Sequence, residues 1–401
     1  MARGQILLTG VAFAVIMVFD VVYGLPESSD TMKRTSDWGE SKRNGPDEED
    51  LPLTVPALDS HQSIVSVTTS VWEWMGKAFV LAFVVYILYR LSKEVFQECV
   101  AKRMGLGVVW KPSPDNWAII TGATDGIGLS YAHNLAEMGY SLLIISRNDE
   151  KLQRVRSDLL SANRACAEVK TLCVDFTRPD IYERIRETLA TLTNIDVLVN
   201  NVGMSYKRYE YFHMIDDLEP FIDQIVNCNV LAVTRMLAIC LPRMVTARRG
   251  IVINVSSITA DCPVPLLAVY SATKAYVDYL SRALEIEYRD TPGLTIQSAV
   301  FGFVATKMSS LKPSFVCPTA DESVRAMLAT VGIKARTHGH YAHRLQITYL
   351  EIISSVLGVT RGRPMVWSQW SYNWLAKFRS RYYEKRGLKD PWLTDNQWLT
   401  V

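Results

Sequence analysis

The stretch "WAIITGATDGIG", residues 117–128, joins a short apolar run directly to three closely spaced glycines. The run "WAIIT" has the composition of a buried strand, and "GLSYAHNLAEMG" at 128–139 has the amphipathic pattern of a helix. A strand, a tight turn and a helix in this order predict the first unit of a parallel sheet. Such a turn places a helix N-terminus beyond the carboxyl end of a strand, where α/β sheets bind ligands.

The same alternation continues through about residue 300, with apolar runs "SLLII", "TLCV", "DVLVN", "GIVINV" and "TIQSAV" separated by longer amphipathic segments. Strands that are apolar throughout and alternate with helices indicate a parallel sheet covered on both faces. We therefore expect a doubly wound α/β domain, a Rossmann fold, over 112–310.

The glycine turn has the features of a dinucleotide cradle. Gly122 permits the tight turn, Gly126 lets backbone approach a pyrophosphate, and Gly128 allows close packing of helix on strand. The free N–H groups and partial positive charge of the helix N-terminus then favour phosphate. Thr124 and Ile127, in the same turn, are expected to contact the dinucleotide as well.

The end of the second predicted strand, "IISRND", indicates which dinucleotide binds. An acidic residue there would bind a ribose 2′-OH and repel a 2′-phosphate, but Ser146 occupies that place and Arg147 follows it. A guanidinium suits a 2′-phosphate, so this pattern favours NADP(H). Asp149 lies nearby, and a solvated arginine at a helix start is the alternative interpretation of Arg147.

Two tyrosine–lysine pairs have the same spacing, "YSATK" at 270–274 and "YRLSK" at 89–93. The second pair ends an apolar stretch, where an interfacial tyrosine and a snorkelling lysine explain it. Tyr270 and Lys274 begin a predicted helix and share one face of it. Ser257, thirteen residues before Tyr270, follows the strand "GIVINV" and so falls at the ligand-binding edge of the sheet.

These motifs in combination resemble the short-chain dehydrogenase/reductase family, with "NNVG" at 200–203 as a further match. Two longer stretches, 254–288 and "FGFVATKM" at 301–308, resemble its membrane-bound branch. That branch contains 17β-hydroxysteroid dehydrogenases and very-long-chain 3-oxoacyl-CoA reductases. The sequence departs from the family pattern at Val202, where alanine is usual, and at 301–303, where "FGF" replaces the usual Pro-Gly.

The resemblance implies a role for each matching residue. Asp175 would lie near the adenine, Asn200 would stabilise the central strand beside the cofactor, and Thr306 would contact the nicotinamide amide. Tyr270 and Lys274 would also contact the cofactor. The catalytic residues would be Asn229, Ser257, Tyr270 and Lys274.

The chemistry of ketone reduction fits these residue types. A free tyrosine has a pKa of about 10, and lowering it by about three units takes roughly 4 kcal/mol. A lysine ammonium about 5 Å away supplies about 3.3 kcal/mol at an effective dielectric of about 20. Ser257 would hydrogen-bond the carbonyl oxygen, and Asn229 would hold a water that links Lys274 to solvent. Taken singly, the serine is equally a loop or helix-cap residue and the asparagine a buried amide.

The segments before the α/β domain contain two apolar stretches. Residues 6–19 read as a signal peptide or an uncleaved anchor within 1–24, and 25–70 reads as a disordered acidic linker. Residues 71–93 predict a membrane helix, with a buried soluble helix as the alternative. Lys and Arg after this helix, against acids before it, predict that the catalytic domain faces the cytosol. The family resemblance implies that the membrane is that of the endoplasmic reticulum.

The segments after the α/β domain differ in composition. Residues 311–360 read as a helical extension that faces substrate or membrane. The tail, 361–401, is rich in Trp and Arg, and its indoles at 367, 370 and 374 share one helix face. This stripe is either core or an interfacial helix on anionic lipid. The last residues, 395–401, lack the lysine-based retrieval signal of some relatives.

Charge and cysteines narrow the class of protein. With 43 Lys and Arg against 41 Asp and Glu, the net charge of +2 argues against nucleic-acid binding. The seven cysteines have no regular spacing, which indicates reduced thiols and no metal site. A homodimer remains one expected partner state.

We therefore expect a membrane-anchored NADPH-dependent reductase of a lipophilic ketone, either a very-long-chain 3-oxoacyl-CoA or a 17-ketosteroid, with the acyl substrate favoured. The alternative is a catalytically silent NADP-binding scaffold at the endoplasmic reticulum membrane, for which Tyr270 is the discriminating residue. A sugar-nucleotide epimerase is disfavoured, because Asp125 interrupts the glycine spacing of that group.

Overall fold

The computed structural model describes residues 59–96, 104, 107–163, 165–261, 263–309, 311–344, 347 and 363–388. The expected signal peptide or anchor and most of the expected acidic linker lie outside these residues. The "YRLSK" pair lies within helix α2 (Asp59–Val95).

A seven-stranded parallel sheet forms the centre of the fold, in the order β3-β2-β1-β4-β5-β6-β7. This order confirms the predicted doubly wound sheet. The strands are β1 (Asn116–Thr121), β2 (Ser141–Ser146), β3 (Val169–Cys173), β4 (Asn194–Asn200), β5 (Gly250–Ser257), β6 (Leu294–Phe301) and β7 (Arg336–Thr337).

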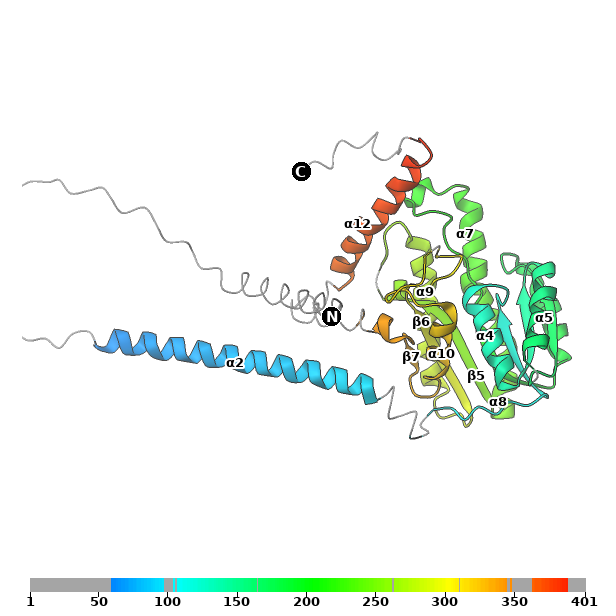
Figure 1. Ribbon diagram of the computed structural model, residues 1–401, viewed down its shortest axis with the longest axis horizontal. Helices are drawn as coiled ribbons and strands as arrows, with labels where there is room; N and C mark the ends of the chain where they lie inside the picture. The colour runs from blue at the N-terminus through cyan, green and yellow to red at the C-terminus, as the bar shows by residue number, and fades with distance from the viewer. Residues whose placement is uncertain are drawn as a thin grey trace, which may run out of the picture. The chain divides into compact units, whose positions relative to one another are not determined.

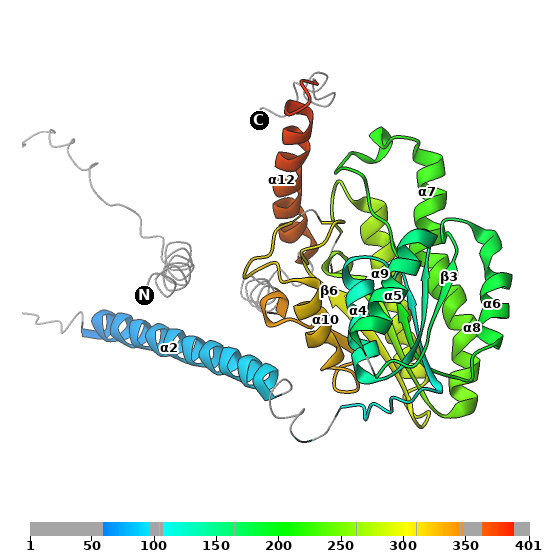
Figure 2. The ribbon, with the colours of Figure 1, turned by 45° about the vertical axis from the view of Figure 1, so that its right-hand side comes forward.

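Helices cover both faces of the sheet (Figures 1 and 2). One core cluster contains residues of α4 (Gly126–Met138), α5 (Asp149–Ala162) and α10 (Ala320–Leu328). The other contains residues of α6 (Tyr182–Ala190), α8 (Ala232–Ala247) and α9 (Ala268–Glu287). Successive residues of β1 enter opposite clusters, since Ala118 and Ile120 join the first and Ile119 joins the second. Both faces of each strand are therefore apolar, which explains the unbroken hydrophobic runs.

The sheet extends past the expected boundary at residue 310. Strand β7 pairs with β6 through Ser298↔Arg336 and Ala299↔Thr337. The Arg336 Nε donates to Asp278 Oδ1 on α9 at 2.9 Å. Since β7 has two residues, it carries no periodicity that marks it as a strand in the sequence.

Helix α2 carries the apolar stretch expected near the N-terminus. Its segment Val71–Tyr89, with mean hydropathy 1.6 and none of it buried, is long and apolar enough to cross a membrane. Leu218–Ala247 passes the same test of length and composition, but half of that window is buried in the α/β domain. The expected apolar helix is therefore present.

Helix α12 (Arg363–Glu384) forms part of the tail. The indole side chains at 367, 370 and 374 lie outside the described side chains, so their placement in core or at lipid stays a prediction. The five cysteines whose side chains the structure describes are free thiols: Cys166, Cys173, Cys228, Cys240 and Cys317.

Candidate active site

The glycine turn between β1 and α4 has the conformation that a phosphate cradle requires. Gly122 and Gly126 have φ values of +69° and +52°, which side chains rarely adopt. A Cβ on Gly128 would lie 2.3 Å from the Gly122 carbonyl oxygen and 2.4 Å from Asn201 Nδ2. Each of the three glycines is therefore needed for this turn, as their spacing predicts.

Polar side chains fix the two ends of this turn. Thr124 Oγ1 lies 2.8 Å from Ser146 Oγ at the end of β2, next to the exposed Arg147. Asp125 caps α4 by accepting from the Gly126 N–H at 2.9 Å, and it pairs with Lys307 at 2.8 Å. The exposed guanidinium of Arg147 thus follows the strand that contacts the cradle. Ile127, which is also expected to contact the dinucleotide, packs against the first core cluster.

The two asparagines of "NNVG" have different partners. Asn200 is buried and donates to Asn254 Oδ1 at 2.8 Å, which ties β4 to β5. Asn201 donates instead to the carbonyls of Thr121 at 2.9 Å and Gly122 at 3.2 Å. Asn201 was not predicted, although it holds the cradle directly. Its adjacency to Asn200 was the available signal, but the strand pairing decides which of the two faces the turn.

Ser257, Tyr270 and Lys274 lie together at the carboxyl edge of the sheet. Ser257 ends β5, and Tyr270 and Lys274 lie in the first two turns of α9. The Ser257 side chain lies beside Tyr270 and lowers the pKa of its phenol, against the rise that burial causes. Lys274 Nζ lies 5.9 Å from the centre of the Tyr270 ring and donates to the Val255 carbonyl at 3.0 Å. Ser257 also accepts from the Thr259 N–H at 3.2 Å, so it is a cap residue as well.

Asn229 lies in a π-turn, Asn227–Leu231, between α7 (Leu218–Val226) and α8. Its Oδ1 accepts from the Met204 N–H at 2.8 Å. Its Nδ2 donates to the Met204 carbonyl at 2.9 Å and to Thr273 Oγ1 at 3.0 Å. A Cβ on Gly203 would lie 3.4 Å from both Asn229 Oδ1 and Lys274 Nζ. Asn229 therefore joins the others, and its side chain anchors the chain that follows β4. The expected water contact stays a prediction.

Thr306 lies beside the cradle, because a Cβ on Gly126 would be 3.1 Å from Thr306 Cγ2. Ser309, which was not predicted, donates to the Val304 carbonyl at 2.6 Å and accepts from the Thr306 N–H at 3.2 Å, holding this loop. Asp175 accepts from the Thr177 N–H at 3.1 Å in the turn after β3. No described contact tests its expected place near the adenine.

The two residues that depart from the family pattern are packed against the core: Phe301, where proline is usual, is buried in the first core cluster. Val202 packs against the second core cluster. A Cβ on Gly302 would lie 2.5 Å from the ring of His343, whose Nε2 lies 2.9 Å from the Phe303 carbonyl oxygen. The glycine in "FGF" thus admits a buried histidine that holds the loop leading to Thr306.

The pKa shifts in this site differ from the expected acidification of Tyr270 by Lys274. Burial raises the pKa of Tyr270, and the Ser257 side chain only partly opposes this rise. Burial also lowers the pKa of Lys274 to about 8, with nearby Cys228 acting in the opposite direction. Loss of water is thus the largest cause of both shifts. At neutral pH this site holds a protonated phenol, which is the form that donates a proton.

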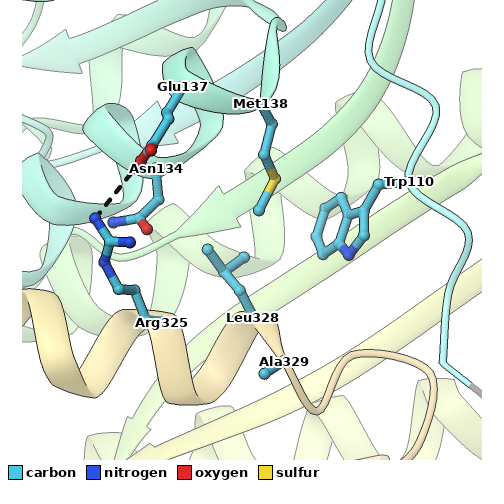
Figure 3. A pocket seen from close by; sticks show the side chains of 7 residues that line it. All are labelled: Trp110, Asn134, Glu137, Met138, Arg325, Leu328 and Ala329. Carbon is cyan, nitrogen blue, oxygen red and sulfur yellow. Dashed lines mark ion pairs between the residues drawn. The ribbon is translucent and has the colours of Figure 1, made fainter. Parts of the chain in front are cut away.

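Two cavities among the described residues bear on this site. One, of about 450 Å³, lies between α4 and α10, with an ion pair of Glu137 and Arg325 at one end and Trp110 at the other (Figure 3). It is lined by these helices rather than by the predicted catalytic residues. The other, of about 310 Å³, is lined by the β4–α7 loop (residues 203–217) and by α7 residues such as Phe221.

Comparison with known sequences identifies relatives for most of this domain. A family model described as short chain dehydrogenase matches residues 116–314. Very-long-chain 3-oxoacyl-CoA reductase-A of Danio rerio is 43% identical over 271 residues, covering 67% of this chain and 82% of the relative. The very-long-chain 3-oxoacyl-CoA reductase of Homo sapiens is 40% identical over 273 residues, covering 68% of this chain and 85% of the relative.

Solved structures share the fold at lower identity. A short-chain dehydrogenase from Sphingobium yanoikuyae in complex with NADPH has a TM-score of 0.52 and 25% identity, covering 61% of this chain and 96% of the other. The bulky-bulky ketone specific alcohol dehydrogenase from Comamonas testosteroni has a TM-score of 0.51 and 25% identity, covering 63% and 95%.

Proposed function

Because the chain belongs to the short-chain dehydrogenase family and is an NAD(P)-dependent oxidoreductase, we propose that it reduces a lipophilic ketone with NADPH. The observation that carries this proposal is the grouping of Ser257, Tyr270 and Lys274, with the Tyr270 phenol protonated and Lys274 Nζ 5.9 Å from the centre of its ring. A scaffold that only binds the cofactor would not require this grouping.

Each residue has a defined part in the reduction. Bound NADPH would supply hydride to the carbonyl carbon. Tyr270 would donate its phenolic proton to the carbonyl oxygen, which yields the alcohol and balances the charge. Ser257 would hydrogen-bond the same oxygen as negative charge develops on it. Lys274 would hold a ribose hydroxyl of the cofactor, and its ammonium would stabilise the phenolate that remains.

The cradle favours NADPH over NADH as the reductant. No acid occupies the end of β2, where Ser146 bonds Thr124 and Arg147 extends into solvent. A guanidinium at this edge can form charge-assisted bonds to a 2′-phosphate. The solved relative from Sphingobium yanoikuyae was obtained in complex with NADPH.

A very-long-chain 3-oxoacyl-CoA is the substrate that the relatives support best. Reductases named for that substrate are 40% to 43% identical to this chain and are covered over 82% to 85% of their length. The apolar segment Val71–Tyr89 is consistent with an anchor that keeps the enzyme where such lipids partition. We place the protein in the endoplasmic reticulum membrane with the α/β domain in the cytosol.

The proposal is tested with the purified full-length chain in detergent. NADPH consumption is measured with 3-oxoacyl-CoA substrates of increasing chain length and with 17-ketosteroids, and NADH is compared as reductant. Tyr270→Phe should lower kcat by about 1,000-fold, within the range for loss of a general acid. Its affinity for NADPH, measured by fluorescence titration, should stay unchanged.

Two outcomes would contradict parts of this proposal. If the wild-type protein binds NADPH but oxidises it with neither panel, the chain is the cofactor-binding scaffold. Reduction of the steroids alone would reject the acyl substrate while keeping the reductase.

A further inference from the structure

Helix α12 contacts the β4–α7 loop through consecutive loop residues, although the family match ends before this helix. The Tyr211 and Tyr372 hydroxyls lie 2.8 Å apart. The ring of Tyr209 meets that of Phe378 edge-on, with centroids 6.1 Å apart. Between these two contacts, Glu210 turns inward. The tail of the chain is thus bound to the loop that follows the central strand.

An ion pair at the centre of this contact is almost fully buried. Arg379 Nε donates to Glu210 Oε1 at 2.6 Å, with side-chain exposures of 4% and 2%. Tyr383 donates its hydroxyl to Glu210 Oε2 at 2.6 Å, and the Tyr211 N–H donates to Oε1 at 3.0 Å. Burial favours a neutral carboxyl, but these hydrogen bonds prevail and lower the pKa of Glu210. The carboxylate is therefore charged, paired and fixed in position.

The same contact reaches the proposed proton donor. Leu375 of α12 forms a buried cluster with Val264, Leu266 and Leu267, the residues just before α9. The Tyr270 ring packs against this cluster. Glu210 joins the same segment through its N–H, which donates to the Leu266 carbonyl at 3.2 Å. The loop, the segment 264–267 and α12 therefore meet around Tyr270.

The side chains at this junction are aromatic and apolar. Tyr206 packs against the cluster and also lines the cavity of about 310 Å³ beside the β4–α7 loop. Tyr206 and Tyr270 pack against the same cluster, so the cavity and the proposed proton donor share one apolar boundary. Flat or extended hydrocarbon suits such a surface, because aromatic faces bury apolar area without needing polar partners.

We propose that α12 is a wall of the ketone-binding site, held in place by the Glu210–Arg379 pair. This inference rests on the proposed reductase function and deepens it. Glu210 and Arg379 are positioning residues, since neither contacts Tyr270 itself. Leu375 and Tyr372 form the wall that sets affinity for the hydrocarbon part of the substrate.

A buried ion pair predicts a specific difference between the effects of replacing one partner and of replacing both. Removal of Arg379 leaves the buried Glu210 carboxylate with Arg208 as its remaining cation, whose Nε donates to Oε2 at 3.3 Å. Loss of one partner of a buried pair is still costly, whereas replacement of both by neutral groups of similar size is often tolerated. Arg379→Met should therefore disturb the loop more than the double variant Glu210→Gln/Arg379→Met does. Such non-additivity identifies a direct coupling between the two side chains.

The first experiment needs no substrate. Amide hydrogen exchange is measured on the full chain for the wild type, Arg379→Met, the double variant and the control Ser380→Ala, an exposed neighbour on α12. Arg379→Met should speed exchange in 203–217 and 363–388, the double variant should partly restore protection, and Ser380→Ala should match the wild type. Exchange in β5 and α9 should not change.

The second experiment measures kinetics on the same variants. Arg379→Met should raise KM for a long-chain 3-oxoacyl-CoA about tenfold, as expected for a lost apolar pocket contact, and keep kcat within about twofold. The affinity for NADPH should be unchanged. A short-chain substrate, which does not reach the wall, should show a smaller rise in KM.

The two experiments separate the two proposals. Unchanged exchange in the loop, or faster exchange across the whole domain, would overturn the role of the pair. Equal losses for short and long substrates would overturn the wall. If the wild type reduces no ketone, the proposed function fails, while hydrogen exchange still decides whether the pair holds the loop.

Discussion

The cofactor side and the substrate side of this site are built in different ways. The cradle uses backbone conformation within seven consecutive residues, from Gly122 to Gly128. The substrate side uses side chains that are distant in sequence, since Glu210 and Arg379 are 169 positions apart. The cradle also lies inside the family match at 116–314, whereas Arg379 lies outside it. The cradle thus depends on a local motif, and the contact with α12 depends on residues that are distant in sequence.

The largest expected effect in this comparison comes from a variant that disrupts the cradle on the cofactor side. In Gly128→Ala, the new Cβ would meet the Gly122 carbonyl at 2.3 Å, and backbone cannot move aside as a flexible side chain can. A displacement on the order of 1 Å at a positioning element costs about 100-fold, so NADPH affinity should fall by at least that factor. Fluorescence titration measures it, with Tyr270→Phe as the control that retains the cradle. Normal NADPH binding by Gly128→Ala would show that the turn does not hold the pyrophosphate.

The next effect is a change of activity with pH. It tests Lys274, which is proposed to hold the cofactor and to stabilise the Tyr270 phenolate. Burial lowers the pKa of Lys274 to about 8, so its ammonium is present below that pH and is lost above it. Because the protonated fraction falls about tenfold per pH unit above the pKa, kcat/KM should be about 30-fold lower at pH 9.5 than at pH 7. The pH profile of the wild type is compared with that of Lys274→Arg, in which the charge persists. A profile that is flat to pH 9.5 in the wild type would contradict the role of the ammonium.

The smallest effect concerns the substrate side alone. Leu375→Ala removes an apolar side chain from the cluster behind Tyr270. KM for the long-chain ketone should rise about tenfold, near the lower end for the loss of an apolar pocket contact. The affinity for NADPH should not change, and steady-state kinetics with varied ketone or varied NADPH separate the two. A rise in both constants would mean that the two sides are not independent.

The same contrast explains what the sequence can predict. The strand–turn–helix unit, the glycines and the grouping of Ser257, Tyr270 and Lys274 follow from local spacing and from the rule that ligands bind at the carboxyl ends of parallel strands. The contact of Asn201 with the cradle cannot be predicted from the sequence. Asn200 and Asn201 are the same residue type, and only the strand geometry decides which of the two side chains points toward the turn. The contribution of burial, which raises the pKa of Tyr270, cannot be predicted either, since spacing does not reveal burial.

Other features have no local signal at all. Strand β7 has two residues, and its place in the sheet depends on pairing with β6. Nothing in the neighbourhood of Arg379 distinguishes it from the other arginines of the tail. Its burial depends on a carboxylate that the chain brings to it from the β4–α7 loop.

The π-turn at Asn227–Leu231 makes the direction of the Asn229 side chain depend on the number of residues between α7 and α8. An α-helix rotates by about 100° per residue, and a π-turn contains one residue more than an α-helical turn would. Deleting one residue here would merge α7 and α8 into a continuous α-helix and rotate one relative to the other by about that angle. Asn229 would then swing away from Met204 and Thr273, its present partners. Length changes are tolerated in surface loops, but here a change of one residue would alter the direction of the Asn229 side chain.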